Sequence, residues 1–223
     1  MKKQVFIPIV LILFAVLTAT AQPLAFSVAT DLGLQRSFKK DQRFWAGGHT
    51  VHALWHMTAK DGPYFWFSYY SAGHFKNNLT ATAKSPGTIP QQINYVNKAE
   101  MRFKQMSIGW KHYIRGSYDT EDGWNLYAAG GFGVILGAVN NTHSVGIDTS
   151  LYNAPVLKGK KNFKRLTLDL SVGWETNLGG AIYFYNDVRV WIPTTDYPSK
   201  YLFVNRDAPV VATLNFGIRI LFD

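Results

Sequence analysis

The sequence predicts an all-β fold, an eight-stranded antiparallel up-and-down transmembrane β-barrel. Apolar and polar residues alternate along eight segments, and this period of two is typical of a strand with one apolar and one polar face. The connections between segments alternate between short and long, as in barrels with short inner turns and longer outer loops. The chain of 223 residues begins with an export signal and contains no cysteine, so hydrogen bonds and packing must hold the fold.

The export signal occupies residues 1–21. Lys2 and Lys3 precede an apolar run from Val5 to Leu17, and residues 19–21 (Ala-Thr-Ala) have the small-x-small pattern of a cleavage site. The run is short for a membrane helix, which needs about 20 apolar residues. We therefore expect a cleaved signal peptide at 1–21 and a barrel domain at 22–223.

The first four predicted strands are roughly residues 24–35, 44–57, 64–75 and 101–114. In the first, Leu32 and Leu34 alternate with Asp31 and Gln35. The second places three large apolar side chains on one face, those of Trp45, Val51 and Trp55. The third is unusually aromatic. Each can therefore present one face to lipid and the other to the lumen.

The last four predicted strands are roughly residues 125–139, 165–175, 181–192 and 210–222. The 165–175 segment has the cleanest pattern, with Leu166, Leu168 and Leu170 between Thr167 and Asp169. The final segment alternates almost without error as far as Phe222. It ends one residue before the chain does.

The predicted connections follow the same alternation. Compact turn signals lie near residues 60–63, 116–123 and 177–180, and a short connection lies near 38–43. The long connections are predicted at 76–100, 140–162 and 193–209. A soluble barrel with an apolar cavity is the alternative, since alternation alone does not tell the two faces apart. The export signal, the terminal strand and the unequal loops favour the membrane barrel, whose closure pairs every backbone group.

The chain resembles the small eight-stranded outer-membrane β-barrel proteins of Gram-negative bacteria. The resemblance covers the mature chain and depends on the signal, the eight alternating segments and the strand that ends in Phe222. It implies an outer-membrane location, with membrane lipid, lipopolysaccharide and the barrel insertion machinery as partners. In this family a terminal aromatic strand is the assembly signal; here Asp223 follows Phe222, so the aromatic residue is penultimate. No motif identifies a subfamily.

A network of charges is predicted inside the barrel. An eight-stranded barrel is just wide enough for side chains to fill it, and buried charges need partners. We therefore predict an ion-pair network that plugs the lumen, with a narrow, porin-like ion path as the alternative. The charges predicted to face inward are Asp31, Lys111, Arg115, Arg165, Asp169, Glu175, Asp187, Arg189 and Arg219.

No residues predict a metal, a cofactor or a catalytic centre. His52 and His56 share a strand face, but four residues of strand separate them by about 13 Å, too far to share a metal ion. The chain has no Gly-x-Ser-x-Gly nucleophile motif, so a lipid A-modifying enzyme that uses His143 and Ser144 lacks support from a motif. We therefore predict a protein that is not an enzyme.

The predicted outer loops are basic. They contain fifteen Lys and Arg residues against five Asp and Glu residues, and the whole chain has a net charge of +9. An exported chain rarely meets nucleic acid, so lipopolysaccharide phosphate is the better anionic partner. The alternative is that these charges only keep the exposed loops soluble. The candidate lipopolysaccharide contacts are Lys39, Lys40, Arg43, Lys158, Lys160, Lys161 and Lys164.

These features predict a structural, adhesive or envelope-interaction role for an outer-membrane barrel whose basic outer loops contact lipopolysaccharide or an external partner. Two alternatives stay open. The barrel could be a narrow channel for a small or hydrophobic solute. It could also be a subunit of an envelope secretion or assembly complex, with a protein partner in the envelope.

Overall fold

The computed structural model describes residues 25–194 and 210–222. The predicted signal peptide, most of the predicted 193–209 connection and Asp223 lie outside them. Among the described residues, no helix is long and apolar enough to cross a membrane. The elements are β1 (Ala25–Ser37), the 3-10 helix η1 (Lys40–Gln42), β2 (Trp45–His56), β3 (Asp61–Ala83), β4 (Gln92–Arg115), β5 (Trp124–His143), β6 (Tyr152–Asn153), β7 (Gly159–Gly179), β8 (Ile182–Pro193) and β9 (Val211–Phe222).

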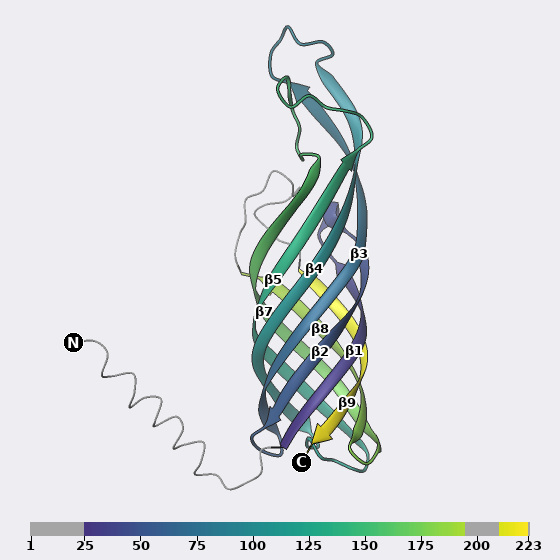
Figure 1. Ribbon diagram of the computed structural model, residues 1–223, viewed down its shortest axis with the longest axis vertical. Coiled ribbons are helices and arrows are strands. Elements are labelled where there is room, and N and C mark those ends of the chain that lie inside the picture. Colours follow the sequence, from purple (N-terminus) through teal and green to yellow (C-terminus); the bar gives the residue numbers. More distant parts are fainter. Residues whose placement is uncertain (1–24, 195–209, 223) are drawn as a thin grey trace, which may run out of the picture.

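Eight long strands form a closed antiparallel ring (Figure 1). The ring runs from β1 through β2, β3, β4, β5, β7 and β8 to β9, and β9 pairs with β1 to close it. Phe26 of β1 lies opposite Trp55 on one side and Phe222 on the other. Closure leaves no edge strand in the ring. This matters in a membrane, because hydrocarbon offers no hydrogen bonds to unpaired backbone N–H and C=O groups. The predicted eight-stranded antiparallel fold is confirmed.

The ring is apolar outside and polar inside. Large side chains point away from the barrel, and Leu32, Ile108 and Phe132 are 73%, 65% and 70% exposed. On β1 the alternating Ser27 and Asp31 are buried inside. Water would disfavour such a continuous apolar surface, whereas lipid favours it. The arrangement is that of a membrane barrel and the reverse of a soluble barrel with an apolar cavity.

Aromatic side chains divide between the two faces. At the end with the short turns, Trp55, Trp110, Trp124 and Trp174 point outward, where amphipathic rings favour the membrane interface. Tyr64, Trp66, Tyr113, Phe44 and Trp191 instead point inward and are buried. The two sets interleave along the chain, because neighbouring residues of a strand face opposite sides of the sheet.

The predicted loop at 76–100 is largely strand and the one at 140–162 is partly strand, which corrects the predicted strand lengths. β3 runs on to Ala83, β4 begins at Gln92, β5 ends at His143 and β7 begins at Gly159. The prediction stopped each strand near the length that a membrane needs, about 9–11 residues. The polar residues beyond that length still alternate with apolar ones, so the sheet continues outside the ring (Figure 1).

This continuation, residues 73–100 and 140–163, is called the extension. It has its own small core, in which β6 pairs with the end of β3. The buried members are Leu79, Ala81, Tyr95, Tyr152 and Val156. The Tyr152 hydroxyl donates a hydrogen bond to the Pro90 carbonyl at 2.9 Å. A core of this kind makes the extension a folded platform instead of a set of separate loops.

Candidate functional site

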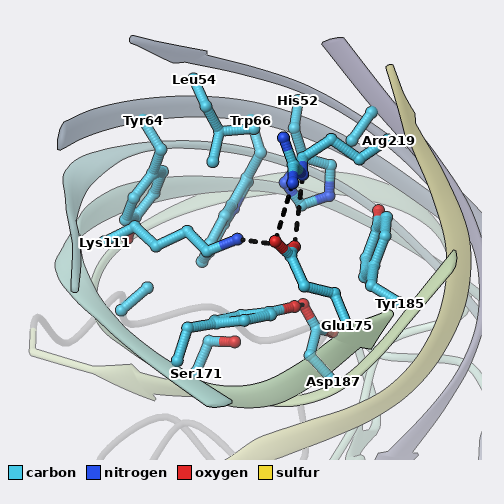
Figure 2. A pocket seen from close by; sticks show the side chains of 13 residues that line it. His52, Leu54, Tyr64, Trp66, Lys111, Ser171, Glu175, Tyr185, Asp187 and Arg219 are labelled. Carbon is cyan, nitrogen blue, oxygen red and sulfur yellow. Dashed lines mark hydrogen bonds and ion pairs between the residues drawn. The ribbon is translucent and has the colours of Figure 1, made fainter. Parts of the chain in front are cut away.

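The lumen contains a charged cluster centred on Glu175 of β7 (Figure 2). Lys111 of β4 lies 3.2 Å from one carboxylate oxygen, and Arg219 of β9 donates to the other at 2.8 Å. The Tyr113 hydroxyl donates to the same carboxylate at 2.8 Å. Arg219 also donates to the Ser27 hydroxyl at 2.9 Å. These contacts tie β4, β7, β9 and β1 together inside the barrel.

A second cluster centres on Arg189 of β8. Its guanidinium forms ion pairs with Asp31 of β1 and, at 2.9 Å, with Asp187. The His52 ring lies 2.9 Å from Asp31, and the Tyr185 hydroxyl donates to that carboxylate at 2.9 Å. Removing such charges from water is costly unless each is paired and hydrogen-bonded, and here the partners are present.

Two of the predicted lumen charges lie inside the barrel but outside these clusters. Asp169 is fully buried and accepts a hydrogen bond from the Gln105 amide at 2.7 Å. Gln105 in turn accepts one from the Trp66 indole at 2.6 Å. Arg165 is also buried, and its guanidinium donates to the Lys164 carbonyl at 3.0 Å.

Arg115 does not face the lumen, which corrects its predicted place in the network. A β-bulge shifts the register of β4 between Tyr113 and Arg115, so that Arg115 lies opposite Leu126, a position on the outer face. The extra residue reverses the alternation after Tyr113. The Arg115 side chain is exposed and stacks over the Trp124 ring at 4.1 Å.

The two histidines on β2 take separate partners. His52 contacts Asp31, whereas His56 lies 2.7 Å from the Ser27 hydroxyl and stacks on Tyr118 with ring centroids 4.3 Å apart. Among residues 25–194 and 210–222, no group of three or more His, Cys, Asp or Glu side chains could hold a metal ion.

His143 and Ser144 have structural contacts in the extension. The His143 ring packs on Tyr95 with centroids 4.6 Å apart, and the Ser144 hydroxyl accepts a hydrogen bond from the Val96 amide at 2.9 Å. Burial lowers the pKa of His143, and nearby Lys158 lowers it further, so the imidazole is neutral at pH 7.

Neutral side chains also bind the lumen charges, and they were not among the predicted site residues. Tyr127 donates to Asp187 at 3.2 Å, and the Asn215 amide donates to the same residue at 2.8 Å. Both lie at inward positions of predicted strands. The period of two could therefore have identified them as facing the lumen, although not which charge each one meets.

Glycines on the wall make room for the inward rings. A Cβ on Gly217 would lie 2.6 Å from the ring of Tyr185 and 2.4 Å from the Thr30 carbonyl oxygen. A Cβ on Gly173 would lie 2.6 Å from the ring of Tyr127. These rings therefore lie against bare backbone, and the space that they leave at this level is a small cavity of about 30 Å³ beside His52, Lys111 and Glu175 (Figure 2). The largest fully buried side chains include Trp66, Trp191, Arg189 and Arg219.

The candidate lipopolysaccharide contacts lie in two groups at the end with the extension. Lys39, Lys40 and Arg43 flank or lie in η1, which connects β1 to β2. Lys158 precedes β7, and Lys160, Lys161 and Lys164 lie in the first part of that strand; all four are exposed.

Phe222, the predicted assembly signal, is 51% exposed on the outer face and packs on Phe26 with centroids 6.1 Å apart. The aromatic ring thus lies at the seam where the last strand meets the first. Its role in assembly stays a prediction.

The fold is that of several solved outer-membrane proteins. The chain is similar to Neisserial surface protein A, with a TM-score of 0.57, 11% identity, and coverage of 89% of this chain and 99% of that one. It is also similar to a major outer membrane protein from Thermus thermophilus, with a TM-score of 0.57, 13% identity, and coverage of 90% and 100%. Ail, the attachment invasion locus protein of Yersinia pestis, in complex with the heparin analogue sucrose octasulfate, has a TM-score of 0.51, 12% identity, and coverage of 90% and 100%.

No protein-family model matches the chain, and no curated protein matches it. At these identities the likeness to the solved structures concerns the fold. It agrees with the apolar exterior, the polar lumen and the closed ring. The chain therefore has the fold of the small eight-stranded outer-membrane β-barrel proteins of Gram-negative bacteria.

Proposed function

We propose that this protein is a closed outer-membrane barrel with a structural or adhesive role, and that its extension is a binding surface for an anionic saccharide at the cell envelope. The observation that supports the proposal most is that four strands, β3, β4, β5 and β7, continue beyond the ring, where β3 and β4 share a core with residues 147–156. A folded platform on a plugged barrel serves binding better than it serves transport.

The charge of the platform favours an anionic partner. Its surface cations lie at the β3–β4 hairpin and around the start of β7: Lys76, Lys84, Lys98, Lys158, Lys160 and Lys161. Asp148 and Glu100 are the carboxylates among residues 73–100 and 140–163. Phosphate in lipopolysaccharide and sulfate in a polysaccharide both pair with such side chains. The sulfated ligand of Ail makes heparin a sensible probe for this chain.

Binding should be measured with purified protein in phosphatidylcholine vesicles, on surfaces coated with heparin or with lipopolysaccharide. The Lys158→Gln/Lys161→Gln variant removes two surface cations of the platform. We expect its affinity to fall about tenfold, since tenfold corresponds to about 1.4 kcal/mol and each of two solvent-exposed ion pairs contributes up to about 1 kcal/mol. The matched control is Lys60→Gln/Arg115→Gln, which removes two cations at the opposite end.

Equal binding by the variant and the wild type, or equal loss in the control, would contradict the proposal. If the variant loses affinity for lipopolysaccharide alone, the partner is the envelope itself. Loss on heparin alone would identify an external sulfated saccharide. If the protein is instead a subunit of an envelope complex, a second protein should co-purify with it. The amount of that protein should be the same for the wild type and the lysine variant.

The channel alternative predicts conductance through the lumen. Fully buried Trp66, Trp191, Arg189 and Arg219 fill the barrel, and the paired charges hold them in place. We therefore expect no steady single-channel current in planar bilayers at neutral pH. A reproducible current from the wild-type protein would make a narrow channel the better account.

A further inference from the structure

The outer face of β4, β5 and β7 changes from apolar to cationic within one row of side chains. Met106, Val134 and Leu166 lie side by side across these strands and form part of the apolar belt. The next row toward the extension places Lys104 opposite Leu136, with Lys164 on the other side of Leu136. A cation thus lies on each flanking strand where the apolar surface ends.

The same face is hollowed at this level. β5 presents only Leu136 and Ala138 outward here, and longer side chains rise on both sides of them. The resulting depression is lined by Arg102, Lys104, Leu136, Ala138, Lys160 and Lys164. A smaller depression beside it shares Arg102, Ala138 and Lys160, so the two form one continuous hollow.

The hollow carries an excess of positive charge. Its one carboxylate, Glu100, is held by the Arg102 guanidinium at 2.7 and 2.9 Å. Within the described part of the chain, the ammonium groups of Lys104, Lys160 and Lys164 have no carboxylate partner. Like charges gathered beside hydrocarbon repel one another in a medium that screens poorly, and a bound anion would relieve the repulsion.

The β1–β2 side of the barrel differs from this face at the level of Lys104 and Lys164. At the corresponding level of β1 and β2, the outward side chains are Leu34, Arg36 and Trp45. Arg36, the cation among these three, stacks over the Trp45 ring at 4.8 Å. The cations Lys39, Lys40 and Arg43 lie beyond this level, in and beside η1, whereas Lys104 and Lys164 directly border the apolar belt.

We propose that the hollow between β4 and β7 binds the phosphate of an outer-leaflet membrane lipid, whose acyl chains lie against Met106, Val134 and Leu166 below it. Lys104 and Lys164 clamp the phosphate from both sides, and Arg102 and Lys160 close the hollow above. Phosphate is favoured over carboxylate because several cations converge on one small space, and a phosphate group offers three acceptor oxygens to them. The inference depends on the proposed orientation, in which the extension lies outside the cell.

Native mass spectrometry of the full barrel in dodecyl maltoside tests the proposal. The probes are bisphosphorylated lipid A, the same lipid without phosphate, and inorganic phosphate as a competitor. We expect one retained molecule of the phosphorylated lipid per barrel and little of the dephosphorylated one. The Lys104→Gln/Lys164→Gln variant should lose retention at least tenfold, whereas the matched Lys158→Gln/Lys161→Gln variant should keep it.

Each other result overturns the site. Equal retention of both lipids would mean that acyl chains alone bind the barrel surface. Competition by millimolar inorganic phosphate would indicate a site for free phosphate without a lipid. Equal loss in the two lysine pairs would indicate net charge instead of the hollow. The Lys158→Gln/Lys161→Gln variant tests the saccharide proposal, and the Lys104→Gln/Lys164→Gln variant tests the lipid site. Either proposal can therefore fail while the other holds. An unchanged mobility shift on boiling would show that every variant is folded.

Discussion

At the scale of single residues, the lumen is held by charges whose partners lie far apart in the chain. Glu175 pairs with Lys111 and Arg219 and accepts hydrogen bonds from Tyr113 and Asn125. Every one of these side chains is buried. A buried ion pair often contributes little net stability, yet the loss of one partner leaves the other charge without compensation.

Glu175→Gln should therefore destabilise the barrel by about 3–5 kcal/mol, because Lys111 and Arg219 would lose their counter-charge. Urea unfolding in vesicles, followed by the mobility of unboiled samples, measures the change. Glu100→Gln is the control, since its pair with Arg102 is exposed and should be worth at most about 1 kcal/mol. Similar unfolding midpoints for the two variants would show that the lumen network adds no stability.

At the scale of elements, bulges decide which way the strands turn beyond the ring. β3 has one between Tyr70 and Gly73, and Ala72 there has a φ of +61°. Before the bulge, even-numbered residues such as Tyr64 and Trp66 face inward. After it, odd-numbered residues such as Leu79 are buried. The bulge coincides with the end of the β2–β3 pairing at Ser71, so the extension departs from the ring at this point.

Substitutions at Ala72 should act on the extension more than on the ring. Ala72→Val places a β-branched residue in the left-handed region and should cost about 1–3 kcal/mol. Ala72→Gly relieves that strain and should be neutral or slightly stabilising. Limited proteolysis of the 84–91 connection, with the mobility shift as a measure of the ring, separates the two effects. Faster cleavage in the glycine variant than in the valine variant would contradict this role of the bulge.

At the scale of the whole molecule, the barrel exposes apolar side chains on its outer face and buries polar ones in its lumen. Leu170 lies about midway along the outward face of β7, between Lys164 at one boundary and Thr176 at the other. It is half exposed, as are Val188 on β8 and Phe216 on β9. Exposure of these apolar side chains is unfavourable in water and favourable in hydrocarbon, so the folded barrel is stable only in lipid.

Leu170→Arg should therefore destabilise the folded barrel in vesicles by about 2–4 kcal/mol. Thr82→Arg, at an exposed site of the extension, should change it by less than about 0.5 kcal/mol. Urea titration of both variants in the same lipid provides the comparison. An arginine tolerated at position 170 would mean that this face does not contact lipid.

The sequence by itself determined the ring and the face on which most residues lie. Once the export signal indicates an outer membrane, a period of two assigns every strand residue to lipid or to lumen, as Leu166 to Trp174 of β7 show. The same rule failed for Arg115, where one extra residue reversed the alternation. The predicted segments were also shorter than the observed strands β3, β4, β5 and β7. Membrane thickness limits only the part of a strand that lies in lipid, and these four strands continue beyond it.

Only the tertiary structure decided which charges meet. Arg189 pairs with Asp31 across 158 residues of sequence, and Arg219 pairs with Glu175 across 44. Such contacts depend on strand register and on the tilt that closes the ring, and no local pattern encodes either of them. The hollow above Leu136 is likewise a product of register, since it exists only because Lys104 and Lys164 flank the same short side chain.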